Sequence, residues 1–119
     1  MTRTRALTAG LVAAALALVA TGCTTVGSDR PLVAVTTNIL GDVVSEVVGD
    51  RADVMVLMPP GADPHSFEVS AQQAARLRSA DLVVENGLGL EEGVARHVRA
   101  AAEDGVPVST AGDAFDPLE

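Results

Sequence analysis

The sequence predicts an α/β fold, an open parallel four-stranded sheet with helices on both faces. Two observations lead to this prediction. Four short apolar runs lack the polar alternation of a strand with one wet face, which is typical of strands covered on both sides. Segments with helical periodicity alternate with these runs. The resulting β-α-β-α-β-α-β order requires parallel strands joined by crossover helices.

The predicted strands are short and end at recognisable turn signals. Their sequences are LVAVT, VMVLM, LVV and VPVST, at residues 32–36, 54–58, 82–84 and 106–110. The second run stops at Pro59 and Pro60, which cannot continue the hydrogen bonding of a central strand. The residues after the fourth run are expected to form turns.

The first predicted helix covers residues 39–48. Asn38 is a suitable N-cap, and Gly49 is expected to end the helix, because glycine readily adopts the backbone conformation that terminates one. The apolar stripe that should face the sheet consists of Ile39, Leu40, Val43, Val44, Val47 and Val48.

The second predicted helix follows Ser70. The Ser70 hydroxyl can cap the helix while Gln73 reaches back, which is the spacing of a capping box. The residues that mark the helix are Ala71, Ala74, Ala75 and Arg78, with Leu77 on the core-facing flank.

The third predicted helix runs from about residue 90 to residue 103. Glu91 and Glu92 lie in its first turn, where negative charge is favourable for the helix dipole. Gly105 is expected to end it.

The segment before the first strand has the features of an export signal. Arg3 and Arg5 precede the apolar stretch 6–20, which is shorter than the ~20 residues that a membrane-spanning helix needs. Small residues then lead to Cys23, the only cysteine, so no intrachain disulfide can form. We predict a signal peptide at residues 1–22.

The position of Cys23 resembles the lipobox of a bacterial lipoprotein, in which the thiol is acylated and becomes the new N-terminus. The usual leucine three places earlier is replaced here by Ala20. Ordinary signal cleavage that leaves a free thiol is the alternative. On the lipobox interpretation, residues 23–30 form the lipidated cysteine and a polar tether, and the lipid anchors the protein to the outer side of the cell membrane.

Composition excludes two classes of function. The net charge is −8, and the aromatic residues are only Phe67 and Phe115, so the chain has neither the basic face nor the stacking platform of a nucleic-acid-binding protein. No nucleophilic triad can be assembled, because Ser66 lies beside His65 without an assignable third member. We therefore assign no catalytic residue and no organic cofactor, and we do not expect an enzyme.

The loop at residues 59–68 contains the most informative side chain, His65. Ligands of parallel sheets bind beyond the carboxyl ends of the strands, and this loop should share that edge with residues 37–38 and 86–87. Three prolines restrict the loop, and imidazole is a common ligand for zinc and other first-row metals. A zinc site needs three or four ligands, and Asp63 and Glu68 are the possible partners in the loop.

Two motifs resemble one protein family. The segments PPGADPHSFEVS and SADLVVENGLGLEEGV, in this order and spacing, are similar to the metal-binding solute receptors of zinc and manganese ABC importers, a family that includes adhesin-like lipoproteins. The segment TTNILGDVVSEVVGD is similar to the family's first strand and helix, and the likeness extends over about residues 32–108.

The resemblance implies a metal site with ligands from two lobes joined by a long helix. Of the family's ligands only the first histidine maps onto this sequence, at His65. Residues 31–119 resemble the amino-terminal lobe, truncated before the linker helix and the second lobe. His97 lies within the third predicted helix, and the resemblance implies no ligand there.

Two functions follow from the resemblance. The first is an extracytoplasmic, lipid-anchored receptor that captures Zn²⁺, or alternatively Mn²⁺, and delivers it to the ABC permease. The second is a surface adhesin or interaction lipoprotein on the same scaffold. Imidazole is a borderline ligand that suits zinc, which favours zinc over manganese.

Overall fold

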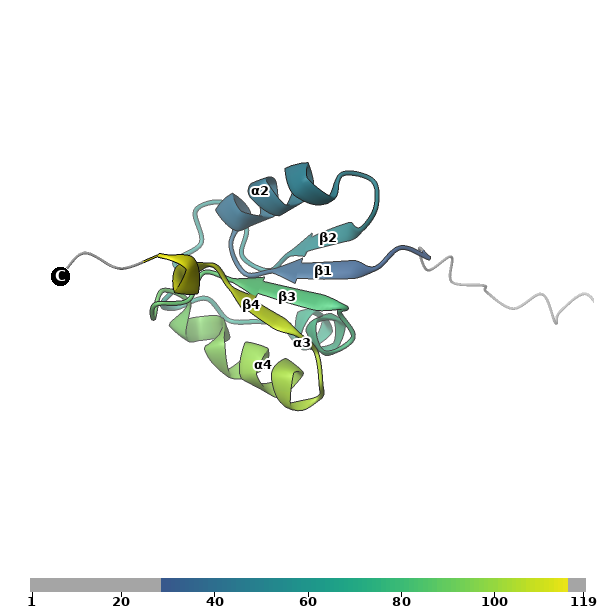
Figure 1. The fold of residues 1–119 in the computed structure, drawn as a ribbon. Coiled ribbons are helices and arrows are strands. Elements are labelled where there is room, and N and C mark those ends of the chain that lie inside the picture. Colours follow the sequence, from purple (N-terminus) through teal and green to yellow (C-terminus); the bar gives the residue numbers. More distant parts are fainter. Residues whose placement is uncertain (1–28, 116–119) are drawn as a thin grey trace, which may run out of the picture.

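The structure is a computed structural model, which describes residues 29–115 of the chain. The predicted signal peptide and Cys23 lie outside these residues. Figure 1 shows the order of the elements along the chain. They are β1 (Leu32–Val35), α2 (Asn38–Val48), β2 (Asp53–Val56), α3 (Ala71–Arg78), β3 (Leu82–Glu85), α4 (Glu92–Glu103), β4 (Val108–Thr110) and the 3₁₀ helix η2 (Ala111–Ala114).

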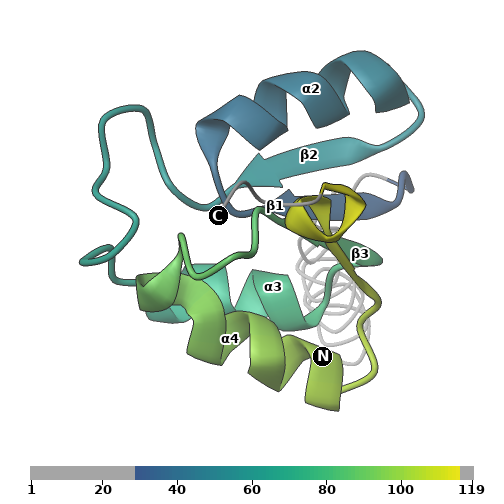
Figure 2. The ribbon, with the colours of Figure 1, turned by 60° about the vertical axis from the view of Figure 1, so that its left-hand side comes forward.

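The four strands form one parallel sheet in the order β2-β1-β3-β4. Ala34 of the central strand β1 pairs with Met55 on one side and with Val83 on the other. Helix α2 covers one face of the sheet, and α3 and α4 cover the opposite face (Figures 1 and 2). The predicted fold class is confirmed. The carboxyl ends of all four strands meet at one edge, as any parallel sheet requires.

The largest apolar core lies between the sheet and the pair α3 and α4. Leu77 of α3, Val83 of β3 and Val94 of α4 are completely buried there. Arg78 at the end of α3 forms an ion pair with Asp104, which closes the far end of α4. This side of the sheet therefore has the packing of a complete core.

The α2 face is less completely packed than the predicted stripe implied. Leu40, Val44 and Val48 turn toward the sheet and are half-buried. The other half of the predicted stripe is exposed. Residues spaced four apart lie on the same side of a helix, and α2 contacts the sheet only with the side that carries the first set. These exposed residues are Ile39 (72%), Val43 (56%) and Val47 (66%).

Helix α2 approaches the sheet closely at Gly41, its only buried residue. A Cβ atom at Gly41 would lie 2.5 Å from Cγ2 of Val56 on β2. The glycine is therefore required by packing at this position, although the helical backbone itself would accept any residue.

The ends of α2 and α3 confirm most of the capping predictions. Ser70 and Gln73 form the predicted capping box, and Gly49 caps the end of α2 with φ +57°. The predicted cap Asn38 is wrong: Thr37 has the extended backbone of an N-cap, and its hydroxyl accepts a hydrogen bond from Leu40 N–H at 3.3 Å. Asn38 is the first helical residue instead.

In α3 Leu77 is the fully buried residue, which confirms its predicted place on the core-facing flank. Three of the residues that mark the helix face solvent: Ala71, Ala75 and Arg78. Helix α4 starts at Glu92, slightly later than the expected start at about residue 90, because Glu91 is its N-cap and has a non-helical backbone with φ −103° and ψ 57°. Within residues 29–115, no helix has the length and hydropathy needed to cross a membrane.

Candidate metal site

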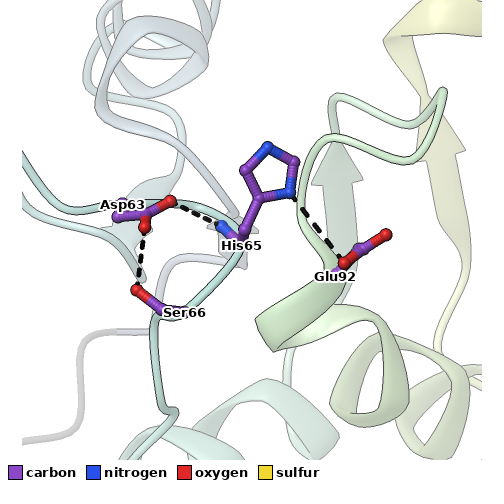
Figure 3. A network of polar contacts seen from close by, with 4 residues as sticks. All are labelled: Asp63, His65, Ser66 and Glu92. Carbon is purple, nitrogen blue, oxygen red and sulfur yellow. Dashed lines mark hydrogen bonds and ion pairs between the residues drawn. The ribbon is translucent and has the colours of Figure 1, made fainter.

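His65 lies on the loop between β2 and α3, at the carboxyl edge of the sheet (Figure 3). The loop is fixed by its own hydrogen bonds. Asp63 accepts one from the backbone N–H of His65 and one from the Ser66 hydroxyl, both at 3.0 Å, and the Asp63 carbonyl accepts a third from Phe67 N–H at 2.9 Å. The backbone at His65 is thereby held without any contribution from its imidazole.

The Asp63 carboxylate acts within this loop. The hydrogen bond from the His65 backbone N–H, helped by the Ser66 hydroxyl, lowers the pKa of Asp63 below its usual value. Both carboxylate oxygens of Asp63 accept hydrogen bonds from the loop. They can both do so at full strength only while Asp63 is ionised, so the ionised form supports this loop conformation. Glu68, the other expected partner, is exposed near the end of the same loop.

Among the described residues, the carboxylate within ion-pair distance of the His65 imidazole belongs to Glu92, the first residue of α4. Nδ1 of His65 and Oε2 of Glu92 are 4.0 Å apart, and the two side chains are 60% and 72% exposed (Figure 3). From the sequence, Glu92 is expected only as a favourable charge at a helix start. The fold adds a second property, because it brings this helix start beside the histidine loop.

Helix α4 also supports the loop through backbone contacts. Gly93 N–H donates a hydrogen bond to the carbonyl of Pro64 at 3.3 Å. A Cβ atom at Gly93 would lie 2.2 Å from the carbonyl oxygen of Phe67. The loop that carries His65 therefore rests directly on the first turn of α4, and only glycine leaves room for it.

Glu91, which precedes Glu92, is the most buried charged residue among those that the structure describes, with 5% of its surface exposed. It was expected in the first helical turn, but its carboxylate turns back toward the sheet instead. One oxygen accepts hydrogen bonds from the Thr36 hydroxyl at 2.6 Å and Asn86 N–H at 2.5 Å, and the other accepts from Gly87 N–H at 3.0 Å.

His97 lies in the middle of α4, separate from this constellation. Its Nε2 accepts a hydrogen bond from Nε of Arg96 at 3.1 Å. Among residues 29–115 no group of three or more histidine, cysteine, aspartate or glutamate side chains is arranged to hold a metal ion. The described part of the chain thus offers one imidazole and one neighbouring carboxylate, and a closed tetrahedral site needs two further donors.

Comparison with a family model and with relatives gives one consistent result. Residues 33–119 match the model of ZnuA, described as "Zinc-uptake complex component A periplasmic". The chain is 35% identical over 111 residues to the manganese-binding lipoprotein MntA of Halalkalibacterium halodurans, covering 87% of this chain and 37% of that one. It is 34% identical over 73 residues to the iron ABC transporter substrate-binding lipoprotein MtsA of Streptococcus pyogenes, covering 61% and 24%.

Solved structures show the same likeness. A manganese-bound periplasmic metal-binding protein from Candidatus Liberibacter asiaticus matches with a TM-score of 0.67 at 29% identity, over 75% of this chain and 33% of that one. The periplasmic zinc-binding protein TroA from Treponema pallidum matches with a TM-score of 0.67 at 28% identity, over 76% and 34%. This chain spans about a third of the length of these two solved proteins.

Proposed function

This chain belongs to the ZnuA family, which confirms the resemblance found in its motifs, and from this premise we propose that it is the amino-terminal lobe of an ABC importer's metal receptor. In this proposal the receptor captures a divalent transition metal outside the cytoplasm and delivers it to the permease. The role is that of a binding protein and not of an enzyme. Residues 31–119 are the part of the lobe present in this chain.

The observation that carries the proposal is the placement of His65. Its loop is fixed by Asp63 and rests on α4, which brings Glu92 to 4.0 Å from the imidazole at the ligand edge of the sheet. Imidazole suits zinc and carboxylate suits manganese as well, so the pair fits either ion. We propose His65 as a direct ligand, with the remaining donors coming from a second lobe.

The identity of the metal is the finer part of the proposal. The relatives and solved neighbours are named for manganese, iron and zinc, so their names support a first-row divalent metal rather than one element. We propose zinc, because the one assigned ligand is an imidazole, and keep manganese as the alternative. The adhesin alternative is not favoured, since these names refer to metal binding and transport.

We further propose that residues 1–22 are a signal peptide and that Cys23 is acylated and anchors the protein outside the membrane through the tether at residues 23–30. Both named relatives above are lipoproteins, which supports this assignment. Mass spectrometry of the membrane-extracted protein should find an acylated Cys23 at the N-terminus. A secreted form that begins at another residue would contradict it.

The role of His65 is tested by competition with a zinc chelator. The chain itself should bind zinc weakly, because only one or two of four donors are present. His65→Ala should remove most of this binding. The matched control His97→Ala should leave it unchanged, because His97 lies elsewhere on α4.

Two outcomes would contradict the proposal. Equal losses from the His65 and His97 variants would show that the site includes the middle of α4 or that the ligand is another residue. Stoichiometric zinc held by the monomeric chain against a strong chelator would contradict the incomplete site. Titration with Mn²⁺ under the same conditions compares the two candidate metals.

A further inference from the structure

We infer that Glu91 is a positioning residue of the metal site. It fixes the start of α4, so that Glu92 and the loop carrying His65 keep their positions relative to each other. The inference rests on the proposed function, because it concerns how the His65 site is built. From the sequence, Glu91 has no role beyond a favourable charge at a helix start. The positioning role follows from three consecutive residues: Glu91 contacts the ends of the two central strands, and Glu92 and Gly93 contact the loop that carries His65.

The first step is the burial of the Glu91 carboxylate. A buried carboxylate is costly unless its oxygens are hydrogen-bonded, and here three donors satisfy them. Thr36, itself completely buried, directly follows the end of β1. Asn86 and Gly87 follow the end of β3. Glu91 therefore ties the ends of the two central strands to the start of α4.

The second step is the conformation of the loop that Glu91 holds. Gly87, Leu88 and Gly89 all have positive φ. Leu88, at +55°, has a backbone conformation that residues other than glycine rarely adopt. Such strain persists only where the surroundings determine it. The hydrogen bonds from Asn86 N–H and Gly87 N–H to the Glu91 carboxylate supply that constraint.

The third step connects Glu91 to the histidine. Directly after it, Glu92 extends to 4.0 Å from the His65 imidazole. Gly93 donates its N–H to Pro64 and lies against the backbone of Phe67. A shift of the start of α4 would therefore move both the carboxylate beside His65 and the support under its loop. Glu91 acts through these neighbours and touches no metal itself.

The experiment uses Mn²⁺ as a paramagnetic probe, because line broadening of NMR signals from nearby backbone amides detects even weak binding. Broadening at the Ser66 and Gly93 amides, which flank the site and are present in every variant, reports the site, and the His97 amide reports unspecific binding in the same sample. The variants are Glu91→Gln, Glu92→Gln and the two combined, each also made in the His65→Ala background.

We expect Glu91→Gln to lower the Mn²⁺ affinity at His65 about ten-fold, the effect typical of groups that orient metal ligands. Glutamine keeps the size of the side chain but places an NH₂ group against a backbone N–H. Glu92→Gln should lower the affinity to a similar degree. The double variant should lose little more than either single variant, because both changes remove the same interaction.

Gly41→Ala is the control for a merely structural role. It places a Cβ atom against Val56 on the opposite face of the sheet and should reduce stability, while leaving every hydrogen bond of the Glu91 carboxylate in place. Its Mn²⁺ affinity, measured below the unfolding transition, should remain within about two-fold of the parent. If Glu91→Gln does not fold, Glu91→Asp keeps the charge, shortens the arm and should show the same loss.

The outcomes separate this inference from the proposed function. If His65→Ala leaves the broadening unchanged, the proposed site itself is wrong. If His65→Ala abolishes the broadening but Glu91→Gln does not weaken it, only the positioning role is wrong. Affinity losses that follow stability equally in Gly41→Ala and Glu91→Gln, or that add fully in the variant combining Glu91→Gln and Glu92→Gln, would also overturn it.

Discussion

The two faces of the sheet carry similar sequence signals but are packed differently. On the face covered by α3 and α4, Leu77 and Val94 are completely buried. On the face covered by α2, Val43 and Val47 have helical spacing and remain 56% and 66% exposed. Apolar periodicity therefore identifies a helix on either face, but it does not show how many sides of that helix are covered.

The difference has an energetic consequence. Burial of apolar surface contributes about 25 cal/mol per Å² removed from water, so side chains that stay exposed contribute little. The stability of the described domain should come mainly from the α3 and α4 side. The following substitutions test this contrast, and all are measured as the free energy of unfolding in urea.

The largest effect is expected in the core under α3. Leu77→Ala removes a completely buried side chain and should lower the free energy of unfolding by about 3 kcal/mol, through lost burial and a cavity. Val47→Ala on α2 is the comparison, with an expected loss several times smaller. Equal losses from the two variants would show that the faces contribute alike.

A smaller effect is expected where α2 does touch the sheet. Gly41→Ala places a Cβ atom against Cγ2 of Val56, and the resulting overpacking should cost about 2 kcal/mol. Combining it with Val56→Ala should recover part of the loss, because the clashing methyl group is removed. If the second substitution gives no recovery, the close approach of α2 to β2 is not the cause.

The stabilisation that the helix caps provide should differ modestly between the two faces of the sheet. Ser70→Ala removes one of the two reciprocal bonds of a capping box, whereas Thr37→Ala removes a single bond of 3.3 Å. We expect losses of about 1 kcal/mol for Ser70→Ala and about half that for Thr37→Ala. A larger loss at Thr37 would mean that α2 depends more on its cap than α3 does.

The smallest effect is expected on the exposed side of α2. Val43→Gln should change the free energy of unfolding by no more than about 0.5 kcal/mol, because the side chain is already in contact with water. Size-exclusion chromatography at two concentrations is the accompanying measurement. A substantial destabilisation together with a loss of self-association would show that this face is covered in solution.

Sequence reasoning succeeded where a single local rule determines the outcome. The capping box at Ser70 and the stop at Gly49 depend on side chains a few residues apart, and both are present. The alternation of strands and helices gave the parallel sheet. The choice between Asn38 and Thr37 as cap was wrong because both can accept the hydrogen bond, and the exit of the chain from β1 decides between them.

The surroundings of His65 were only partly predictable. The rigid loop and its position at the ligand edge follow from the prolines and from the sheet, but the neighbour at 4.0 Å was not foreseen. Glu91 and Glu92 already had a sufficient local explanation as charges at a helix start. Their contacts join residues far apart in sequence, such as Thr36 and Glu91, and a local pattern contains no information about them.

The central position of β1 affects the time course of folding. Strand β1 lies between β2 and β3, so the edge that faces β3 is paired only after Ala34 has met Val83. Parallel pairings of this kind close long loops before any compensating contact forms, which makes folding slow compared with a hairpin-based sheet. As the chain emerges from a ribosome or a translocation channel, β2 can cover one edge of β1, but the other edge stays open until the segment through β3 is out.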